Sequence, residues 1–400
     1  MSNIFSLSAP GLVTPLGHDA HSVLSGLLAG SRQGLIENDT LTPGRKMYTG
    51  TAAVAEQKLP ANTDWPLPYR TRNNQLLVMA YEQIKTQVDS LIKQHGAARI
   101  GIVLGTSTSG IREGELAIAH YMQNGKLPHD FSYPQQELSS ATEFLSWYSG
   151  AQGPRYVIST ACSSSGKAFL SARRLLRLGL CDAVIVGGAD SLCQLTLRGF
   201  DALESISSGI CMPCSATRDG INIGEGAALF IMQRDAQAEI LFLGGGESSD
   251  AHHISAPHPD GLGAIAAMQQ ALNDAQLNSD AIAYVNLHAT GTPLNDAMES
   301  KAMHAVFGAN TPCSGTKGMT GHLLGAAAVS ELAYCWLLLS SLNTAQRLAP
   351  HVWDGQWDNE LMPMALTDNN SRLDKTRHAM MSNSFAFGGN NVSLIIGRAQ

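Results

Sequence analysis

Short apolar runs alternate along this chain with longer segments in which apolar residues recur every three or four positions. The short runs are rich in β-branched residues and end at small residues, as buried strands do. The predicted strands are residues 99–105, 156–159, 183–187, 228–232 and 283–287. Helical spacing predicts helices over residues 73–94 and 165–178. This alternation predicts an α/β fold in which helices cover a central sheet.

One pattern occurs twice, once in each half of the chain. YVISTACSSSGKAFLSARRLL in the first half and TPCSGTKGMTGHLLGAAAVSELAY in the second both read as a short strand, a turn of small and hydroxyl residues, and an apolar-faced helix. Such an internal repeat predicts two similar halves related by a pseudo-twofold axis. We place the halves at residues 1–240 and 241–400, with the two turns close together.

Composition and charge narrow the class of protein. Hydrophobic residues make up 44% and charged residues 15% of the chain, which excludes disorder for its bulk. The net charge of −7 excludes an overall positive field for nucleic acid or an anionic membrane. Seven scattered cysteines indicate reduced thiols. The N-terminus has no Lys or Arg before Arg32, and no apolar run reaches the ~18 residues of a membrane span. We therefore expect a cytoplasmic protein without membrane insertion.

Cys162 follows a predicted strand directly and precedes a helix. A sharp strand-to-helix turn exposes a nucleophile, and a helix N-terminus favours thiolate over thiol. An inert, buried cysteine in a tight turn is the alternative. The small residues around Cys162, such as Ala161 and Gly166, leave space for a substrate.

His288 and His322 lie in two turns of the second half that are rich in Gly and Thr. Lys317 precedes His322 by five residues, and Glu331 follows it by nine. A single histidine usually belongs to a core or a surface. Two histidines opposite a cysteine in the matching turn of the other half suit thioester chemistry.

These motifs resemble the β-ketoacyl-[acyl-carrier-protein] synthases of the elongating type I/II kind, which are condensing enzymes of the thiolase fold. The resemblance rests on TACSSS at Cys162, HATGTPLND from His288, GTKGMTGHLLGAA around His322, and NSFAFGGNN from Asn383. It implies two layered halves in an αβαβα arrangement. It also implies an acyltransferase that condenses a Cys-bound acyl group with malonyl-acyl-carrier protein and releases carbon dioxide, in fatty-acid or polyene and polyketide elongation.

The resemblance also assigns roles to residues. Cys162 is the acyl acceptor, His288 and His322 act in decarboxylation and condensation, Lys317 orients His322 or the groups behind it, and Glu331 braces that network. The backbone N–H groups of Cys162 and Phe387 form the oxyanion hole, and Phe387 gates the acyl channel. The pantetheine arm binds at Thr290, Thr292 and Ser255. No metal and no cofactor beyond the carrier's own phosphopantetheine is implied.

Several residues depart from the family pattern. Ser163 and Ser164 stand where Ala and Thr are usual, Lys167 where His or Asn is common, Ala386 where Gly is usual, and Asn390 where Thr is usual. Because Ala lacks the φ freedom of Gly, the loop at Phe387 is expected to be stiffer. These departures favour a specialised polyene or polyketide pathway, such as the bacterial aryl polyene type, over housekeeping fatty-acid synthesis.

The implied partners are an acyl carrier protein, acyl and malonyl thioesters, and a second subunit that is either identical or related. Acyl carrier proteins are acidic, so an acidic enzyme needs a local basic patch to attract them. We predict this patch at Arg70 and Arg72, with Arg198 as a weaker choice.

Two other functions stay open at this point: a non-catalytic partner subunit of the chain-length-factor kind, and a Cys-His thioester hydrolase. The first typically lacks the cysteine, and the second has little use for a second histidine. We set aside a redox or zinc role for Cys211 and Cys214, because no second pair follows. Metal binding by His252, His253 and His258 is also set aside, because no acidic ligands accompany them.

Overall fold

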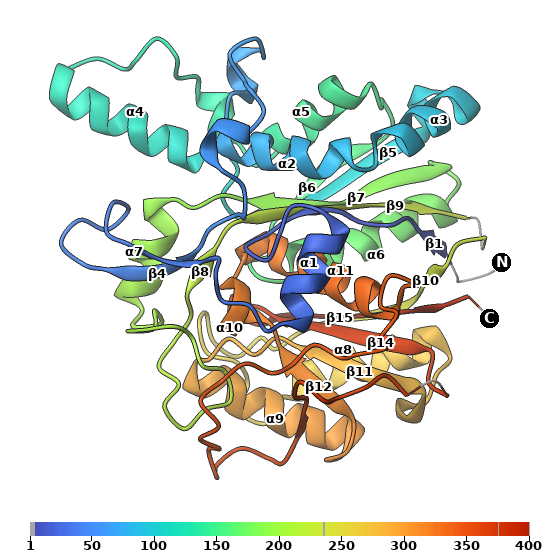
Figure 1. Cartoon of the computed structure of the whole chain (residues 1–400). Coiled ribbons are helices and arrows are strands. Elements are labelled where there is room, and N and C mark those ends of the chain that lie inside the picture. The colour runs from blue at the N-terminus through green and yellow to red at the C-terminus, as the bar shows by residue number, and fades with distance from the viewer. Residues whose placement is uncertain (1–4, 235–236, 375, 400) are drawn as a thin grey trace.

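The computed structural model describes residues 5–234, 237–374 and 376–399, whose helices and strands form five alternating layers (Figure 1). One outer layer holds α2 (Arg72–Glu82), α3 (Lys85–His95) and α5 (Ser140–Ser149), and the other holds α8 (Leu262–Ala275) and α9 (Pro293–Phe307). Between the two halves of one continuous sheet lie α1 (Ala20–Leu28), α6 (Ser164–Arg177) and α11 (Ala327–Leu339). The predicted α/β fold with layered halves is therefore confirmed.

The two halves of the chain pair their strands in the same way. In the first half, β5 (Ile100–Gly105) lies parallel to β6 (Arg155–Ile158) and to β7 (Ala183–Asp190), and β7 pairs antiparallel with β9 (Gly226–Gln233). In the second half, β11 (Ile282–Leu287) lies parallel to β12 (Pro312–Gly315) and β14 (Ala379–Phe385), and β14 pairs antiparallel with β15 (Asn390–Arg398). The strand pairing thus repeats as the internal sequence pattern predicts.

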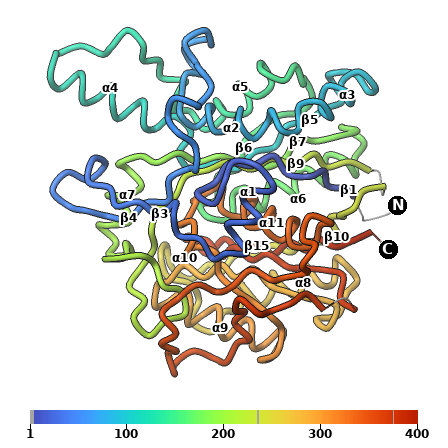
Figure 2. Tube along the Cα trace, viewed as in Figure 1, coloured from blue at the N-terminus to red at the C-terminus, as the bar shows by residue number. Residues whose placement is uncertain are grey.

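The halves join through hydrogen bonds in the middle of the molecule. β1 (Phe5–Leu7) pairs antiparallel with β9 on one side and with β10 (Ile240–Ser249) on the other, and β10 pairs with β15. Figure 2 shows the first half mostly above and the second half mostly below, with α11 of the second half in the middle layer. The division at residue 240 stays a prediction.

Other elements lie outside these layers. They are β2 (Gly11–Val13), which pairs with β9; a three-stranded sheet of β3 (Leu35–Asn38), β4 (Met47–Gly50) and β8 (Ile223–Gly224); β13 (Ala365–Leu366) beside β12; α4 (Ile111–Asn124), α7 (Gln194–Ala202) and α10 (Lys317–Thr320). No helix in the described ranges has the length and apolarity that a membrane span requires.

The middle layer explains the character of α11. Every residue of α11 is buried, because one sheet covers it from each side. A helix that is apolar all round is typical of such a position. Phe169 of α6 packs edge-to-face on Phe230 of β9, with ring centroids 5.6 Å apart, and the two belong to the same core as Leu332 of α11. This core fixes α6 and α11 relative to each other.

The predicted strands correspond to β5, β6, β7, β9 and β11, and residues 165–178 correspond to α6. The single helix predicted over residues 73–94 is wrong. The Gln83 side chain donates from Nε2 to the carbonyl oxygens of Met79 and Leu12 and accepts from the Leu12 N–H. These bonds end α2 at Glu82, and α3 begins at Lys85.

Candidate active site

Cys162 lies in the turn between β6 and α6, and hydroxyl groups hold that turn. Ser164 Oγ accepts from the Thr160 N–H at 2.8 Å and donates to the Ala161 carbonyl at 2.6 Å. Ala161 has a positive φ of 52°, which turns the chain sharply before the cysteine. Ser163 Oγ donates to the Thr160 carbonyl. The turn thus presents Cys162 Sγ at the N-terminus of α6, as predicted for a nucleophile.

The charge state of Cys162 differs from the expectation. Burial raises the pKa of the Cys162 thiol to about 11, although Lys317 and the backbone N–H groups of Phe387 and Cys162 lower it. The side chain is only 4% exposed. In the free enzyme, desolvation therefore favours the thiol over the thiolate and opposes the effect predicted for the helix N-terminus.

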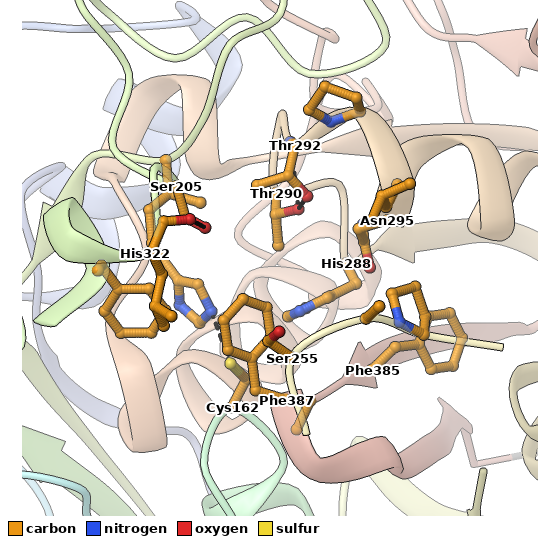
Figure 3. A pocket seen from close by; sticks show the side chains of 18 of the residues that line it. Cys162, Ser205, Ser255, His288, Thr290, Thr292, Asn295, His322, Phe385 and Phe387 are labelled. Carbon is orange, nitrogen blue, oxygen red and sulfur yellow. Dashed lines mark hydrogen bonds between the residues drawn. The ribbon is translucent and has the colours of Figure 1, made fainter. Parts of the chain in front are cut away.

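His322 directs one ring nitrogen at the cysteine. Its Nε2 lies 2.9 Å from Cys162 Sγ, and its Nδ1 accepts from the Leu324 N–H at 3.0 Å (Figure 3). A neutral imidazole that accepts at Nδ1 carries its proton at Nε2. Burial and the Lys317 charge hold the pKa of His322 well below its usual range. His322 is therefore a neutral donor toward the cavity.

His288 is also a neutral donor, but different residues hold it in place. It follows β11, and its N–H and that of Ala289 donate to the two carboxylate oxygens of Glu299 on α9, each at 2.7 Å. Lys317 Nζ lies 3.3 Å from His288 Nδ1 and donates to the His288 carbonyl. Burial, with Lys317 and His322, holds the pKa of His288 well below its usual range. Nε2 of His288 is thus also a proton-bearing donor.

Lys317 and Glu331 form a buried ion pair behind the two rings. Lys317 Nζ lies 2.5 Å from Glu331 Oε1, and Lys317 is 1% exposed. Burial raises the pKa of Glu331 to about 7, against the effect of Lys317. Lys317 contacts His288 and not His322, so the prediction that Lys317 orients His322 directly is wrong.

Cys162, His288 and His322 meet at the floor of a cavity of about 280 Å³. Their Sγ and ring nitrogens all lie within 4.8 Å of one another, and the two rings cross at 85° (Figure 3). Over the described ranges, this is the one cluster of ligand atoms close enough to hold a metal ion. The expectation of no metal stays a prediction.

The other predicted site residues line the same cavity. Thr290 and Thr292 join their hydroxyl groups at 2.9 Å, and Ser255 lies on the rim. The Phe387 ring stacks on Phe200 of α7 at 5.4 Å, and the Phe387 N–H is directed at Cys162 Sγ. These positions fit the roles predicted for these residues, which stay predictions.

Two buried carboxylates escaped the sequence reasoning. Glu299 holds the backbone at His288, and its only signal in the sequence is an acidic residue eleven positions after that histidine. Asp190, at the end of β7, accepts from the Thr108 hydroxyl and the Ser107 N–H with one oxygen and from the Ala326 N–H with the other. It thereby ties a turn of the first half to the segment just after His322.

The two predicted carrier-binding arginines lie away from this cavity. Arg72 is 8% exposed, and its guanidinium binds the carboxylates of Glu225 and Glu56. The prediction for Arg72 is therefore wrong, because two carboxylates already neutralise its charge. Arg70 is half-buried, donates to the Trp65 carbonyl, and lines a separate cavity.

Arg198 has a more suitable position. It is exposed on α7, the helix whose Phe200 lines the active-site cavity, and Leu203 follows at the helix C-terminus on the same rim. Among the described residues it has no ion-pair partner. Cys211 and Cys214, set aside above, are buried free thiols, and Cys211 Sγ donates to the Thr290 carbonyl.

Comparisons with known proteins agree with this geometry. Residues 73–238 match the model of the beta-ketoacyl synthase N-terminal domain, and residues 240–348 match that of the C-terminal domain. The chain is 33% identical over 337 residues to 3-oxoacyl-[acyl-carrier-protein] synthase 2 of Staphylococcus aureus, covering 80% of each.

Two solved structures are similar over nearly the whole chain. The ketosynthase ApeO of Xenorhabdus doucetiae, solved in complex with its chain length factor ApeC, gives a TM-score of 0.92 at 44% identity, covering 99% of this chain and 98% of that one. A beta-ketoacyl synthase from Burkholderia phymatum gives 0.86 at 26% identity and covers 100% of both chains.

Proposed function

This chain belongs to the β-ketoacyl synthase family and is a 3-oxoacyl-[acyl-carrier-protein] synthase, and from this premise we propose roles for its residues, its pathway and its partners. The observation that carries the proposal is the convergence of one thiol and two neutral imidazoles in one buried cavity. A Claisen condensation needs these groups: a thiol that holds the acyl chain and N–H donors that stabilise an enolate.

In the loading step, Cys162 Sγ attacks the thioester carbonyl of an acyl-carrier protein. The Sγ–C bond forms, the bond from carbon to the pantetheine sulfur breaks, and the thiol proton leaves with the pantetheine sulfur. The N–H groups of Cys162 and Phe387 stabilise the oxyanion of the tetrahedral intermediate. The thiol of the free enzyme is protonated, so it must lose its proton as it attacks. The two N–H groups stabilise the negative charge that develops in this step.

In the second step, the malonyl thioester oxygen accepts hydrogen bonds from Nε2 of His288 and of His322. The C–C bond to the carboxylate breaks and carbon dioxide leaves. The electron pair of the broken bond forms the enolate. The enolate carbon then attacks the carbonyl on Cys162, and the Cys162 sulfur leaves. Lys317 keeps the proton of His288 on Nε2 by occupying Nδ1, as the Leu324 N–H does for His322.

The pantetheine arm enters past Thr290, Thr292 and Ser255, which supply hydroxyl groups along a mostly apolar lining. The acidic carrier protein docks beside Arg198. Changing Arg198 to Glu should raise KM for carrier-bound substrate and leave a small pantetheine thioester unaffected. Lys93→Glu, an equal charge reversal on α3, is the matched control. Equal changes in both variants would remove Arg198 from the docking surface.

The pathway we propose is elongation of a polyene chain of the aryl polyene type. The 44% identity to ApeO supports this, as does the departure of this chain from the housekeeping pattern at Ser163 and Ser164. By the same likeness, the chain pairs with a related chain-length-factor subunit. β6 ends the strand order with one edge free in the described part of the chain, and α4 exposes Ile118 and Met122. An open edge and an apolar face are both typical of an interface.

Intact-protein mass spectrometry after incubation with an acyl-carrier thioester tests the function. The expected result is one acyl group on Cys162, followed by a 3-oxoacyl-carrier product when malonyl carrier is added. Free fatty acid would indicate a hydrolase, and no adduct would indicate a non-catalytic subunit. Adding a related subunit in native mass spectrometry separates a heterodimer from a homodimer.

A further inference from the structure

Two of the residues that depart from the family pattern contact each other. Lys167 Nζ donates to Asn390 Oδ1 at 2.9 Å, across 223 positions of sequence. Neither side chain belongs to the Cys162, His288 and His322 group or lines the cavity above it. The contact therefore calls for a role other than binding substrate.

The fold brings the two residues together at a close crossing of α6 and β15. A Cβ atom on Gly166 would lie only 2.6 Å from Val392 Cγ1, so only glycine allows the helix so near the strand. Lys167 follows Gly166 on α6, and Asn390 is the first residue of β15. Both residues are partly buried.

Asn390 also closes the loop that carries Phe387. The Ala386 N–H donates to the Asn390 carbonyl at 2.9 Å, and the Gly389 N–H donates to the Ala386 carbonyl at 3.0 Å. Gly388 and Gly389 both have positive φ, at 79° and 72°. Phe387 and the glycines have no side-chain hydrogen-bonding group. Asn390 is therefore the one residue of this loop whose side chain can accept a hydrogen bond, whereas Ile254, Asp250 and the Asn391 side chain bond to the loop backbone.

We propose that Lys167 is a positioning residue, which through Asn390 holds the loop 386–390 so that the Phe387 N–H stays directed at Cys162 Sγ. An oxyanion hole needs two donors at a fixed separation. Here one donor, the Cys162 N–H, lies just before α6, and the other lies on a distant loop. A hydrogen bond from α6 to that loop holds the two donors at a fixed separation.

The charge around Lys167 is consistent with this position. Arg174, further along α6, pairs with Glu247 of β10 in a bond that does not reach the loop. Lys167 feels both of these charges, and burial lowers its pKa. A bond from an ammonium group to an amide oxygen is stronger than a neutral one, so this link is suited to hold a glycine-rich loop.

The inference rests on the proposed function, since the Phe387 N–H matters only if Cys162 carries the acyl group. The test compares Lys167→Met, Asn390→Ala and the double variant with the wild type in condensation of an acyl group with malonyl carrier. Each single variant should lower kcat by about threefold to tenfold, with a smaller change in KM. The double variant should be no slower than the slower single variant, because both remove one link. Lys167→Arg, which keeps a donor, should restore most of kcat.

Arg174→Met is the matched control, because it removes a cation from the same helix without touching the loop. It should keep the wild-type kcat. The inference is overturned if Lys167→Met behaves like Arg174→Met, or if the two single effects multiply in the double variant. If Lys167→Met does not fold, Asn390→Ala with Asn390→Asp as its rescue decides the same point. A wild-type enzyme that forms no acyl-Cys162 would instead overturn the proposed function.

Discussion

The turn that carries Cys162 and the turn that carries His322 begin alike and continue differently. Each follows a strand that lies parallel to the central strand of its half, β6 beside β5 and β12 beside β11. After β6, the chain enters α6 at Ser164. After β12, it passes through α10 and a short 3₁₀ segment, η6 (Leu324–Ala326), before α11 begins at Ala327.

The two turns also differ in what holds them. Neutral hydroxyl groups such as Ser164 Oγ stabilise the cysteine turn, whereas the His322 turn begins at the buried Lys317–Glu331 pair. Glu299 holds the neighbouring His288 turn. The repeated strand pairing brings the turns together, and the extra residues of the second turn add the charges that keep two imidazoles neutral and oriented. The repeated strand pairing thus places the two turns close together, and the differences between the turns provide the groups that keep the histidines neutral.

The largest expected effect removes the activity of the cysteine turn and leaves that of the histidines intact. Cys162→Ala should lower condensation by at least about 10⁴-fold, because no acyl acceptor remains. Decarboxylation of malonyl carrier should continue, since both histidines keep their supports. Release of labelled carbon dioxide, measured beside product formation, checks this. Loss of both activities would mean that the histidine group depends on the thiol.

The reciprocal change affects the other turn. His288→Ala or His322→Ala should lower carbon dioxide release by roughly 10²- to 10³-fold, the usual cost of one oxyanion donor. Acyl transfer to Cys162 should survive in part, as mass spectrometry of the loaded enzyme would report. His129→Ala, at an exposed histidine outside this group, is the control and should keep both rates. Near-normal release in either test variant would remove that histidine from the mechanism.

Much of this arrangement could be predicted from the sequence, because its signals are local. The strand, turn and helix around Cys162 lie within one stretch of residues, and so do β11 and His288. The repeat predicted that the turns meet. The helix over residues 73–94 was wrong because the Gln83 side chain, bound to Leu12 of a distant strand, breaks it.

Other features depend on partners far away in sequence. Arg72 looks like a surface residue until Glu225 folds against it, and the Cys162 pKa depends on burial by segments of both halves. The contact of Lys167 with Asn390 is of the same kind. Each of these residues was noticed in the sequence, but the contacts that it makes in the fold could not be predicted.

The supports of the cysteine turn and of the His288 turn should differ in their contribution to stability. Glu299→Ala leaves two buried N–H groups unsatisfied and should lower the free energy of unfolding by roughly 2 to 4 kcal/mol. Ser164→Ala leaves one and should lower it by about 1 kcal/mol. Guanidinium denaturation at neutral pH measures both, with the exposed Glu360→Ala as control. Equal losses from the two variants would contradict the difference between a carboxylate support and a hydroxyl support.

The smallest expected effect concerns whether burial or the helix N-terminus determines the pKa of Cys162. Burial raises the pKa of Cys162 to about 11, so the thiolate is a minor species at neutral pH and its fraction rises with pH. The rate at which iodoacetamide alkylates Cys162 should therefore increase about tenfold per pH unit between pH 7 and 9. Peptide mapping at each pH ensures that only Cys162 is counted. If the helix N-terminus controlled the thiol instead, its pKa would lie near or below neutral and the rate would level off in this range. A plateau below pH 8 would therefore reverse the conclusion that desolvation dominates at the nucleophile.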